Sequence, residues 1–404
     1  MTSTKNNHYF SYSLLFLLVV LGDSLNFIVG TNLQIIILLF LALFQIFKLR
    51  ITKIKVNSLK IYMFTAVAII FLTLRNSINV DSLISLKFFY LVIPAFIFYF
   101  KAPNIDELLF RYFKVITIAI LFLICVHFLG FRNTMEIVFG EGFVKELSYV
   151  RLATNECVLL GLFFLIKYRE SKNISQLFFS LVFFAIPHLF SFEIQRGILI
   201  ASIFSILVGL GFFKGPFKLR SFSLKPIRLF FFGSAFILLI YNLNESNKQK
   251  IDSIYNIITL QEIDNLNDSS ITGRINEINL VFEELVPNPI FGNGYFRPSL
   301  ANDMFAERFF IADIGLIGVF YTLGLFGILL YIFQFFSFLS FFSYKHKNIR
   351  NHNFMLFRCF LGYLIIISIS TGVTIHKFAL FLAVLIILKM IEKNEIDKFN
   401  YTNI

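Results

Sequence analysis

Residues 356–390 read LFRCFLGYLIIISISTGVTIHKFALFLAVLIILKM, and this stretch decides the kind of fold that we expect. A helix needs about 20 predominantly apolar residues to cross the hydrocarbon core of a membrane. The stretch holds two runs close to that length, 356–372 and 374–390, which are separated by little more than Thr371 and Gly372. It therefore predicts two membrane helices, joined either as a tight hairpin or as a re-entrant pair.

Comparable apolar runs recur along the whole chain of 404 residues, and they lie at 10–28, 31–48, 58–74, 82–100, 112–131, 152–168, 175–191, 194–213, 226–243 and 310–342. The chain is 57% hydrophobic and 15% charged, which is too little charge to cover a soluble protein of this size. The run 310–342 exceeds one span, so we expect its first part, Phe309 to Gly318, at the outer interface before the chain turns inward. The pattern predicts an all-α, polytopic integral membrane protein, a single membrane domain over 1–404 with about 12 transmembrane helices.

The distribution of basic residues sets the expected orientation. With the N-terminus inside and the runs crossing alternately, 24 of the 36 Lys and Arg residues fall in cytoplasmic segments, 11 fall in outer segments, and Lys87 lies within a run. Cytoplasmic loops retain Lys and Arg, and a shift of the frame by one helix would remove this contrast. We therefore expect cytoplasmic N- and C-termini, and the net charge of +12 then reflects topology and not a nucleic-acid partner.

One connection, residues 244–308, is far longer than any other and lies between the ninth and tenth runs. Loops of this length usually carry function. Residues 268–270 (Asp-Ser-Ser) supply helix-capping side chains, and apolar residues then recur at helical spacing until Pro287. A second amphipathic helix is predicted over 246–263, on the membrane surface. We thus expect a large extracytoplasmic loop with one or two short helices.

The loop carries the strongest local constellation, residues 272–277 (TGRINE) followed by residues 287–297 (PNPIFGNGYFR). Arg274 and Glu277 are three residues apart and share a helical face, where a surface ion pair is the ordinary alternative. The glycines of the second stretch permit positive φ and close backbone approach, which can aim N–H groups at an anion, although a plain turn is a competing interpretation. The candidate substrate-binding residues here are Gly292, Gly294, Tyr295 and Arg297.

Two further candidates stand at the outer ends of expected helices. Arg196 lies in a very short turn between two apolar runs, and an arginine at such a boundary is most often a snorkelling anchor. Because the positive-inside bias disfavours arginine on the outer side, phosphate binding through paired hydrogen bonds is the functional alternative. Asp313 precedes small residues that favour helix packing, but a carboxylate between apolar residues costs free energy unless it is paired or used.

The remaining polar residues of the apolar runs are left out of the site, since none has a partner at metal-ligand spacing; they are Asp23, Lys87, Glu156, His127, His188 and His376. The three cysteines show no such spacing either. No Walker loop, dinucleotide fingerprint or nucleophile elbow occurs in the sequence. We therefore expect no metal and no other cofactor, and no ATP hydrolysis, redox chemistry or acyl transfer.

In their order along the chain, these features resemble the bacterial superfamily of O-antigen polymerases (Wzy-type) and O-antigen ligases; they are the Arg196–Gly197 turn, the Arg274 helix, the run Asn288–Gly294 and the segment Asp313–Gly327. The resemblance covers the topology and residues 190–330 in particular. It implies a multi-pass glycosyltransferase of the bacterial cytoplasmic (inner) membrane that uses polyprenyl-pyrophosphate-linked oligosaccharides at the outer face. A hydroxyl of one lipid-linked repeat unit would attack the anomeric carbon of a growing chain, and the lipid pyrophosphate would leave.

The resemblance also implies roles for matching residues. Arg196 and Arg274 become candidates for stabilising the departing pyrophosphate. Glu277 and Asp313 become candidates for the catalytic base or for positioning the sugar. Gln195 departs from the small polar residue that relatives often have before this arginine.

Three functions are compatible with the sequence. Ligases of the superfamily carry a functional histidine at the outer end of the helix after the large loop, and this chain has no histidine between His188 and His346, which favours a repeat-unit polymerase of O antigen, capsule or exopolysaccharide. A ligase-like glycan transferase and a transporter or flippase of lipid-linked oligosaccharide are the alternatives. Transporters place polar groups near the midplane in broken helices, unlike the candidates here. Besides its lipid-linked substrate and membrane lipid, a polymerase would have a chain-length regulator and a flippase of the same pathway as partners.

Overall fold

The computed structural model describes five leucines between 14 and 21 and then the following residues: 105–128, 154–190, 196–209, 213–215, 218–219, 277–279, 281–282, 289–292, 314–342, 349, 351–376 and 378–402. The expected spans 31–48, 58–74, 82–100 and 226–243 lie outside the described residues. The count of twelve helices and the sides of the two termini therefore stay predictions.

The described part is helical apart from one two-stranded hairpin. Its elements are α8 (Ile105–Phe128), α11 (Thr154–Ser171), α12 (Ile174–Phe190), α13 (Arg196–Gly209), β1 (Phe213–Gly215), β2 (Lys218–Leu219), α18 (Gly315–Ser340), α19 (His352–Thr371), α20 (Val373–His376) and α21 (Phe378–Thr402). β1 and β2 pair antiparallel just beyond α13. The apolar run 194–213 is expected from the sequence to be helical throughout, but the helix ends at Gly209. A glycine there and the Gly-Pro pair at 215–216 both disfavour helix continuation.

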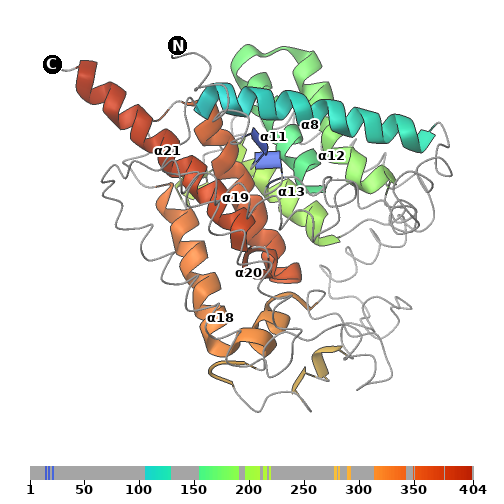
Figure 1. Ribbon diagram of the computed structural model, residues 1–404, viewed down its shortest axis with the longest axis vertical. Coiled ribbons are helices and arrows are strands. Elements are labelled where there is room, and N and C mark those ends of the chain that lie inside the picture. Colours follow the sequence, from blue (N-terminus) through green and yellow to red (C-terminus); the bar gives the residue numbers. More distant parts are fainter. Residues whose placement is uncertain are drawn as a thin grey trace, which may run out of the picture.

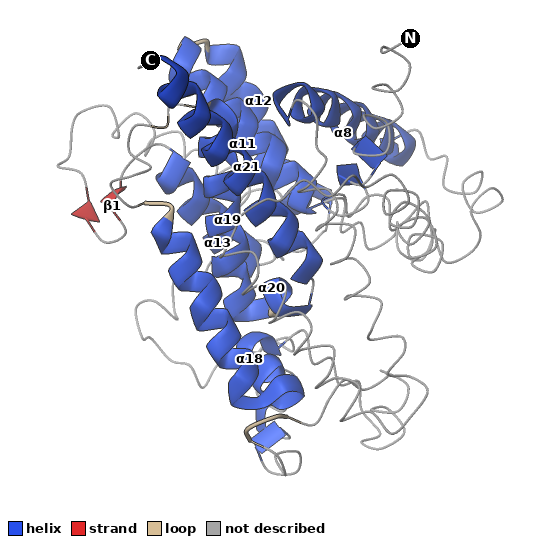
Figure 2. Cartoon of the chain, turned by 60° about the vertical axis from the view of Figure 1, so that its left-hand side comes forward, coloured by secondary structure: helices blue, strands red, loops and turns tan. Residues whose placement is uncertain are grey.

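The apolar stretch 356–390 forms a hairpin, one of the two arrangements expected. α19 begins after Asn351, whose side-chain oxygen accepts a hydrogen bond from Phe354 N at 3.1 Å. It ends at Gly372, which adopts the left-handed conformation (φ 59°) that suits glycine at a helix C-terminus. The chain then passes through α20 and returns as α21, which packs along α19 (Figures 1 and 2).

The long run 310–342 is broken, as its excess length predicts, but at Gly324 and not near Gly318. Gly324 has φ 64° and ψ −154°, so the ribbon labelled α18 consists of a short helix, 315–323, and a longer one, 325–340. Figure 2 shows the change of direction at the lower end of α18. The backbone at Gly324 occupies a region of φ and ψ that is essentially restricted to glycine.

Two of the described helices, α19 and, taken across its break, α18, are long and apolar enough to cross a membrane, and α12 and α13 hold shorter apolar segments. Together with the apolar composition they indicate a membrane protein. α8 differs from the expected span 112–131: in both views it lies across one end of the helices and not alongside α18 and α19 (Figures 1 and 2). Its first turns carry Asp106, Glu107 and Arg111, which explains why this segment is less suited to the hydrocarbon core.

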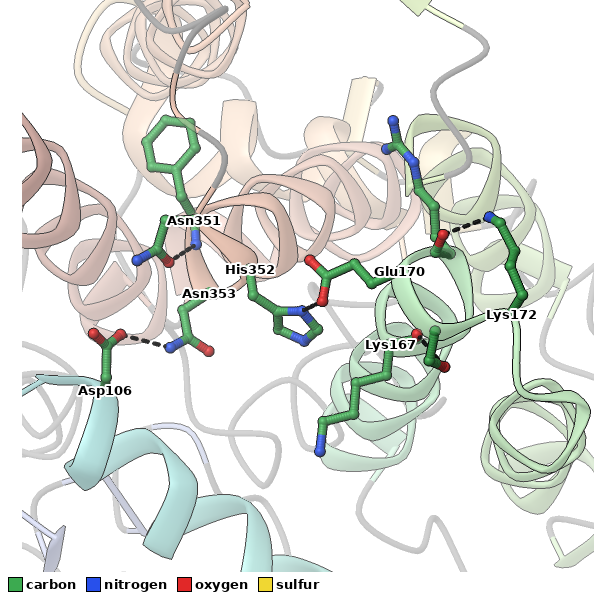
Figure 3. A network of polar contacts seen from close by, with 10 residues as sticks. Asp106, Lys167, Glu170, Lys172, Asn351, His352 and Asn353 are labelled. Atoms are coloured by element: carbon green, nitrogen blue, oxygen red, sulfur yellow. Dashed lines mark hydrogen bonds and ion pairs between the residues drawn. The ribbon is translucent and has the colours of Figure 1, made fainter.

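At the end where α8 lies, which we call the α8 end, polar side chains join separate helices. His352 Nδ1 lies 2.9 Å from Glu170 Oε2, and Asn353 donates to Asp106 Oδ1 at 2.8 Å. Figure 3 shows these side chains directed toward one another from α8, α11 and α19. The start of α8, the end of α11 and the start of α19 are helix ends that the predicted topology, with spans crossing alternately, assigns to the same side of the membrane. The opposite end, near α20, is called the α20 end.

Candidate functional site

The candidate site is built at the α20 end, on the last turn of α19. α13 begins at Arg196, and the following Gly197 lies against the hydroxyl of Ser370. A Cβ atom at Gly197 would overlap Ser370 Oγ, so the absence of a side chain permits this contact. Helix α13 therefore starts directly beside the end of α19.

The first residue of α18 meets the same turn of α19. Gly315 has φ 57°, and a Cβ atom there would overlap the carbonyl oxygen of Ile369 and lie 2.7 Å from the carbonyl carbon of Ser370. Ser370 is thus contacted by Gly197 and by Gly315, which belong to two of the segments singled out from the sequence, the Arg196–Gly197 turn and Asp313–Gly327. We call this meeting of α13, α18 and α19 the Ser370 junction.

The third segment, residues 289–292 of the large loop, crosses the break in α18. Leu325 N donates to Pro289 O at 2.8 Å, and Phe326 N donates to Ile290 O at 3.4 Å. Gly292 is buried, has φ 70°, and would bring a Cβ atom within 2.5 Å of the backbone of Thr322 and Leu323. We call this contact the loop crossing. It lies about 13 Å along the helix axis from the Ser370 junction, since residues 315–323 separate the two.

Two helix N-termini therefore point toward this region. The first turns of α13 and α18 carry backbone N–H groups without intrahelical acceptors, and they form the positive ends of the helix dipoles. The residue before α18, Ile314, provides no side-chain hydrogen bond to cap them. Such an arrangement of N–H groups suits a negatively charged ligand such as phosphate.

The structure places Glu156, which the sequence did not assign to the site, at the level of Arg196. Arg169 Nη1 donates to Gly209 O at 3.1 Å, and both α11 and α13 run antiparallel to α19. Glu156 lies 13 residues before Arg169, and Arg196 lies 13 residues before Gly209, so the two positions share one level in these parallel helices. Glu156 is fully buried. A carboxylate inside an apolar run was the available signal in the sequence.

The structure describes only part of the predicted set. Arg196 is the first residue of α13, and Gly292 lies in the loop crossing. Glu277 is half-buried in a short helical segment, 277–279. That segment lies at the α20 end, together with 289–292, in gold at the bottom of Figure 1. The other candidates lie outside the described residues: Arg274, Gly294, Tyr295, Arg297 and Asp313.

Within the residues that the structure describes, no group of three or more His, Cys, Asp or Glu side chains is arranged to hold a metal ion. In comparisons with known proteins, neither a family model nor a curated protein matches this chain. The likeness to O-antigen polymerases therefore stays a prediction that depends on the motifs themselves.

Proposed function

We propose that this chain is a polysaccharide repeat-unit polymerase, a membrane glycosyltransferase that transfers a growing glycan from polyprenyl pyrophosphate onto a lipid-linked repeat unit. The observation that supports it is the convergence on the α20 end. Segments separated by more than 100 residues, which follow Arg196 and Asp313 in sequence, both contact Ser370. The large-loop segment 289–292 accepts hydrogen bonds from Leu325 and Phe326, just beyond the break in α18, and its Gly292 lies against Thr322 and Leu323 of the short helix.

The reaction needs a cationic environment for its leaving group. A hydroxyl oxygen of the acceptor unit forms a bond to the anomeric carbon, the bond from that carbon to the pyrophosphate oxygen breaks, and the hydroxyl proton passes to a base. Arg196, Arg274 and the N-termini of α13 and α18 are the groups that we assign to the developing pyrophosphate charge. Glu277 or Asp313 is assigned to accept the proton.

We also propose a location and an orientation for the protein. In the bacterial cytoplasmic membrane, the α20 end faces outward and the α8 end faces the cytoplasm. This orientation follows from the distribution of Lys and Arg between the two sets of connections.

Deletion of the gene in the source bacterium, followed by complementation, tests the proposal. We expect the ladder of long polysaccharide to collapse to single repeats while the lipid-linked unit accumulates at the outer face. An unchanged ladder would refute the proposal. Accumulation on the cytoplasmic face would indicate a transporter, and long polymer that stays on its polyprenyl carrier would indicate a ligase.

Complementation with Arg196→Ala or Arg274→Ala should fail to restore the ladder at normal protein levels. The matched control is Arg111→Ala, because Arg111 lies on α8, at the opposite end, in an exposed ion pair with Glu107 at 2.8 Å. Wild-type ladders from both test variants would remove these arginines from the site.

A further inference from the structure

We propose that Arg169 and Arg358 form a binding site for a phosphate group at the α8 end, and that the phosphate is that of an anionic membrane lipid. This site lies at the opposite end from the Ser370 junction and does not depend on the proposed function. The two arginines come from different helices, α11 and α19, and no motif of the sequence analysis includes them.

The two guanidinium groups lie near each other. Arg169 Nη1 donates to the carbonyl oxygen of Gly209, the last residue of α13, at 3.1 Å. A Cβ atom at Gly209 would lie 3.6 Å from Cys359 Sγ, and Cys359 follows Arg358 directly. Both positive charges act on the Cys359 thiol, and the charge of Arg169 also acts on Arg358.

The hydrogen-bond partners of both arginines among the described residues are not carboxylates. Arg358 Nη2 contacts Met355 Sδ at 2.8 Å, its Cζ lies 4.7 Å from the centroid of the Phe342 ring, and its Nε is buried without a described hydrogen-bond partner. A guanidinium packed on an aromatic face keeps its N–H edge available for paired hydrogen bonds to a phosphate.

Three carboxylates of the α8 end contact residues other than the two arginines. Glu170 contacts His352, and Glu392 contacts Lys389 at 2.8 Å. Glu395 accepts from Asn351 at 3.3 Å. Arg169 is exposed and Arg358 is half-buried; their like charges repel each other, and a bound anion would offset that repulsion.

The exposed surface of α18 favours a lipid over free phosphate as the ligand. One face of α18 exposes large apolar side chains at successive turns: Leu325 (49% exposed), Leu329 (58%), Ile332 (41%) and Phe336 (61%). This stripe ends within two turns of Phe342, the ring on which Arg358 packs. An acyl chain along the stripe would therefore place its phosphate near the arginine pair. Basic pockets between membrane helices are known to bind lipid headgroups.

Native mass spectrometry of the full chain in detergent tests the site, with phosphatidylglycerol and phosphatidylcholine titrated in parallel. We expect preferential retention of phosphatidylglycerol, and at least a roughly tenfold loss of its affinity in the double variant Arg169→Gln, Arg358→Gln, because charge-assisted hydrogen bonds are lost. The matched control is Lys167→Gln, which removes a positive charge from the same end of α11 and should bind as wild type.

A second arm identifies the source of the phosphate. Inorganic phosphate at millimolar concentration should leave phosphatidylglycerol bound; displacement would overturn the lipid assignment and support a soluble phosphate ligand. If the double Gln variant does not fold, Arg169→Lys with Arg358→Lys replaces it, because it keeps both charges and removes the paired geometry. Equal affinities of wild type and the folded double variant would overturn the site.

Discussion

The loop crossing makes a quantitative prediction for Gly324→Ala. The φ of 64° and ψ of −154° at this position cost about 1–3 kcal/mol for a residue with a side chain. The new Cβ atom would also lie 2.5 Å from the carbonyl carbon and oxygen of Ile290. If the loop moves away, the bonds from Leu325 N to Pro289 O and from Phe326 N to Ile290 O are lost, at about 0.5–1.5 kcal/mol each.

The expected total is therefore roughly 2–6 kcal/mol. For a chain of 404 residues this corresponds to a decrease in Tm on the order of 2–7 °C, measured for the purified protein in detergent. Gly209→Ala is the matched control, because its Cβ atom would meet Leu165 and Cys359 at ordinary contact distances of 3.5 and 3.6 Å. The control should change stability by no more than about 1 kcal/mol. Equal Tm values for Gly324→Ala and wild type would refute the steric reasoning.

Three further outcomes follow from the described contacts. Gly197→Ala should lower Tm and Ser370→Gly should largely restore it, because the new methyl group then loses its clashing partner; an additive pair of effects in the double-mutant cycle would argue against the Ser370 junction. Ser368→Ala should cost about 1–3 kcal/mol, since the Ser368 hydroxyl accepts from the Thr374 N–H at 2.7 Å in a buried turn, and an unchanged Tm would contradict this. Glu170→Gln at the α8 end should change stability by less than about 1 kcal/mol, because its contact with histidine is exposed; a large loss would mean that this end is more buried than the structure shows.

A buried carboxylate offers a separate test of the candidate site. Glu156→Gln keeps the shape of the side chain and removes its charge, so we expect lower polymer yield in the complementation assay with the protein still inserted. Glu107→Gln, on the exposed start of α8, is the control. A normal yield of polymer from Glu156→Gln would show that Glu156 has a structural role only.

The sequence determined those features that depend on composition and local pattern. The apolar runs predicted helices, and α11, α12 and α19 lie close to the predicted ranges because hydrocarbon or protein interior is the only stable surrounding for such segments. The excess length of 310–342 predicted a break in the helix. The glycines of the loop motif permit positive φ and close backbone approach, and Gly292 shows both, within a turn at 289–291.

Only the tertiary structure decided which of these segments meet. The hydropathy of a segment does not specify which helices pack against it. The contact of Ser370 with Gly197 and Gly315 could therefore not be inferred from the apolar runs of the sequence. The break at Gly324 is placed by its contact with Ile290 and not by local propensity alone. The transverse path of α8 also depends on packing against the other helices. Contacts between residues distant in sequence set these features, because their free energy depends on the partner as much as on the segment itself.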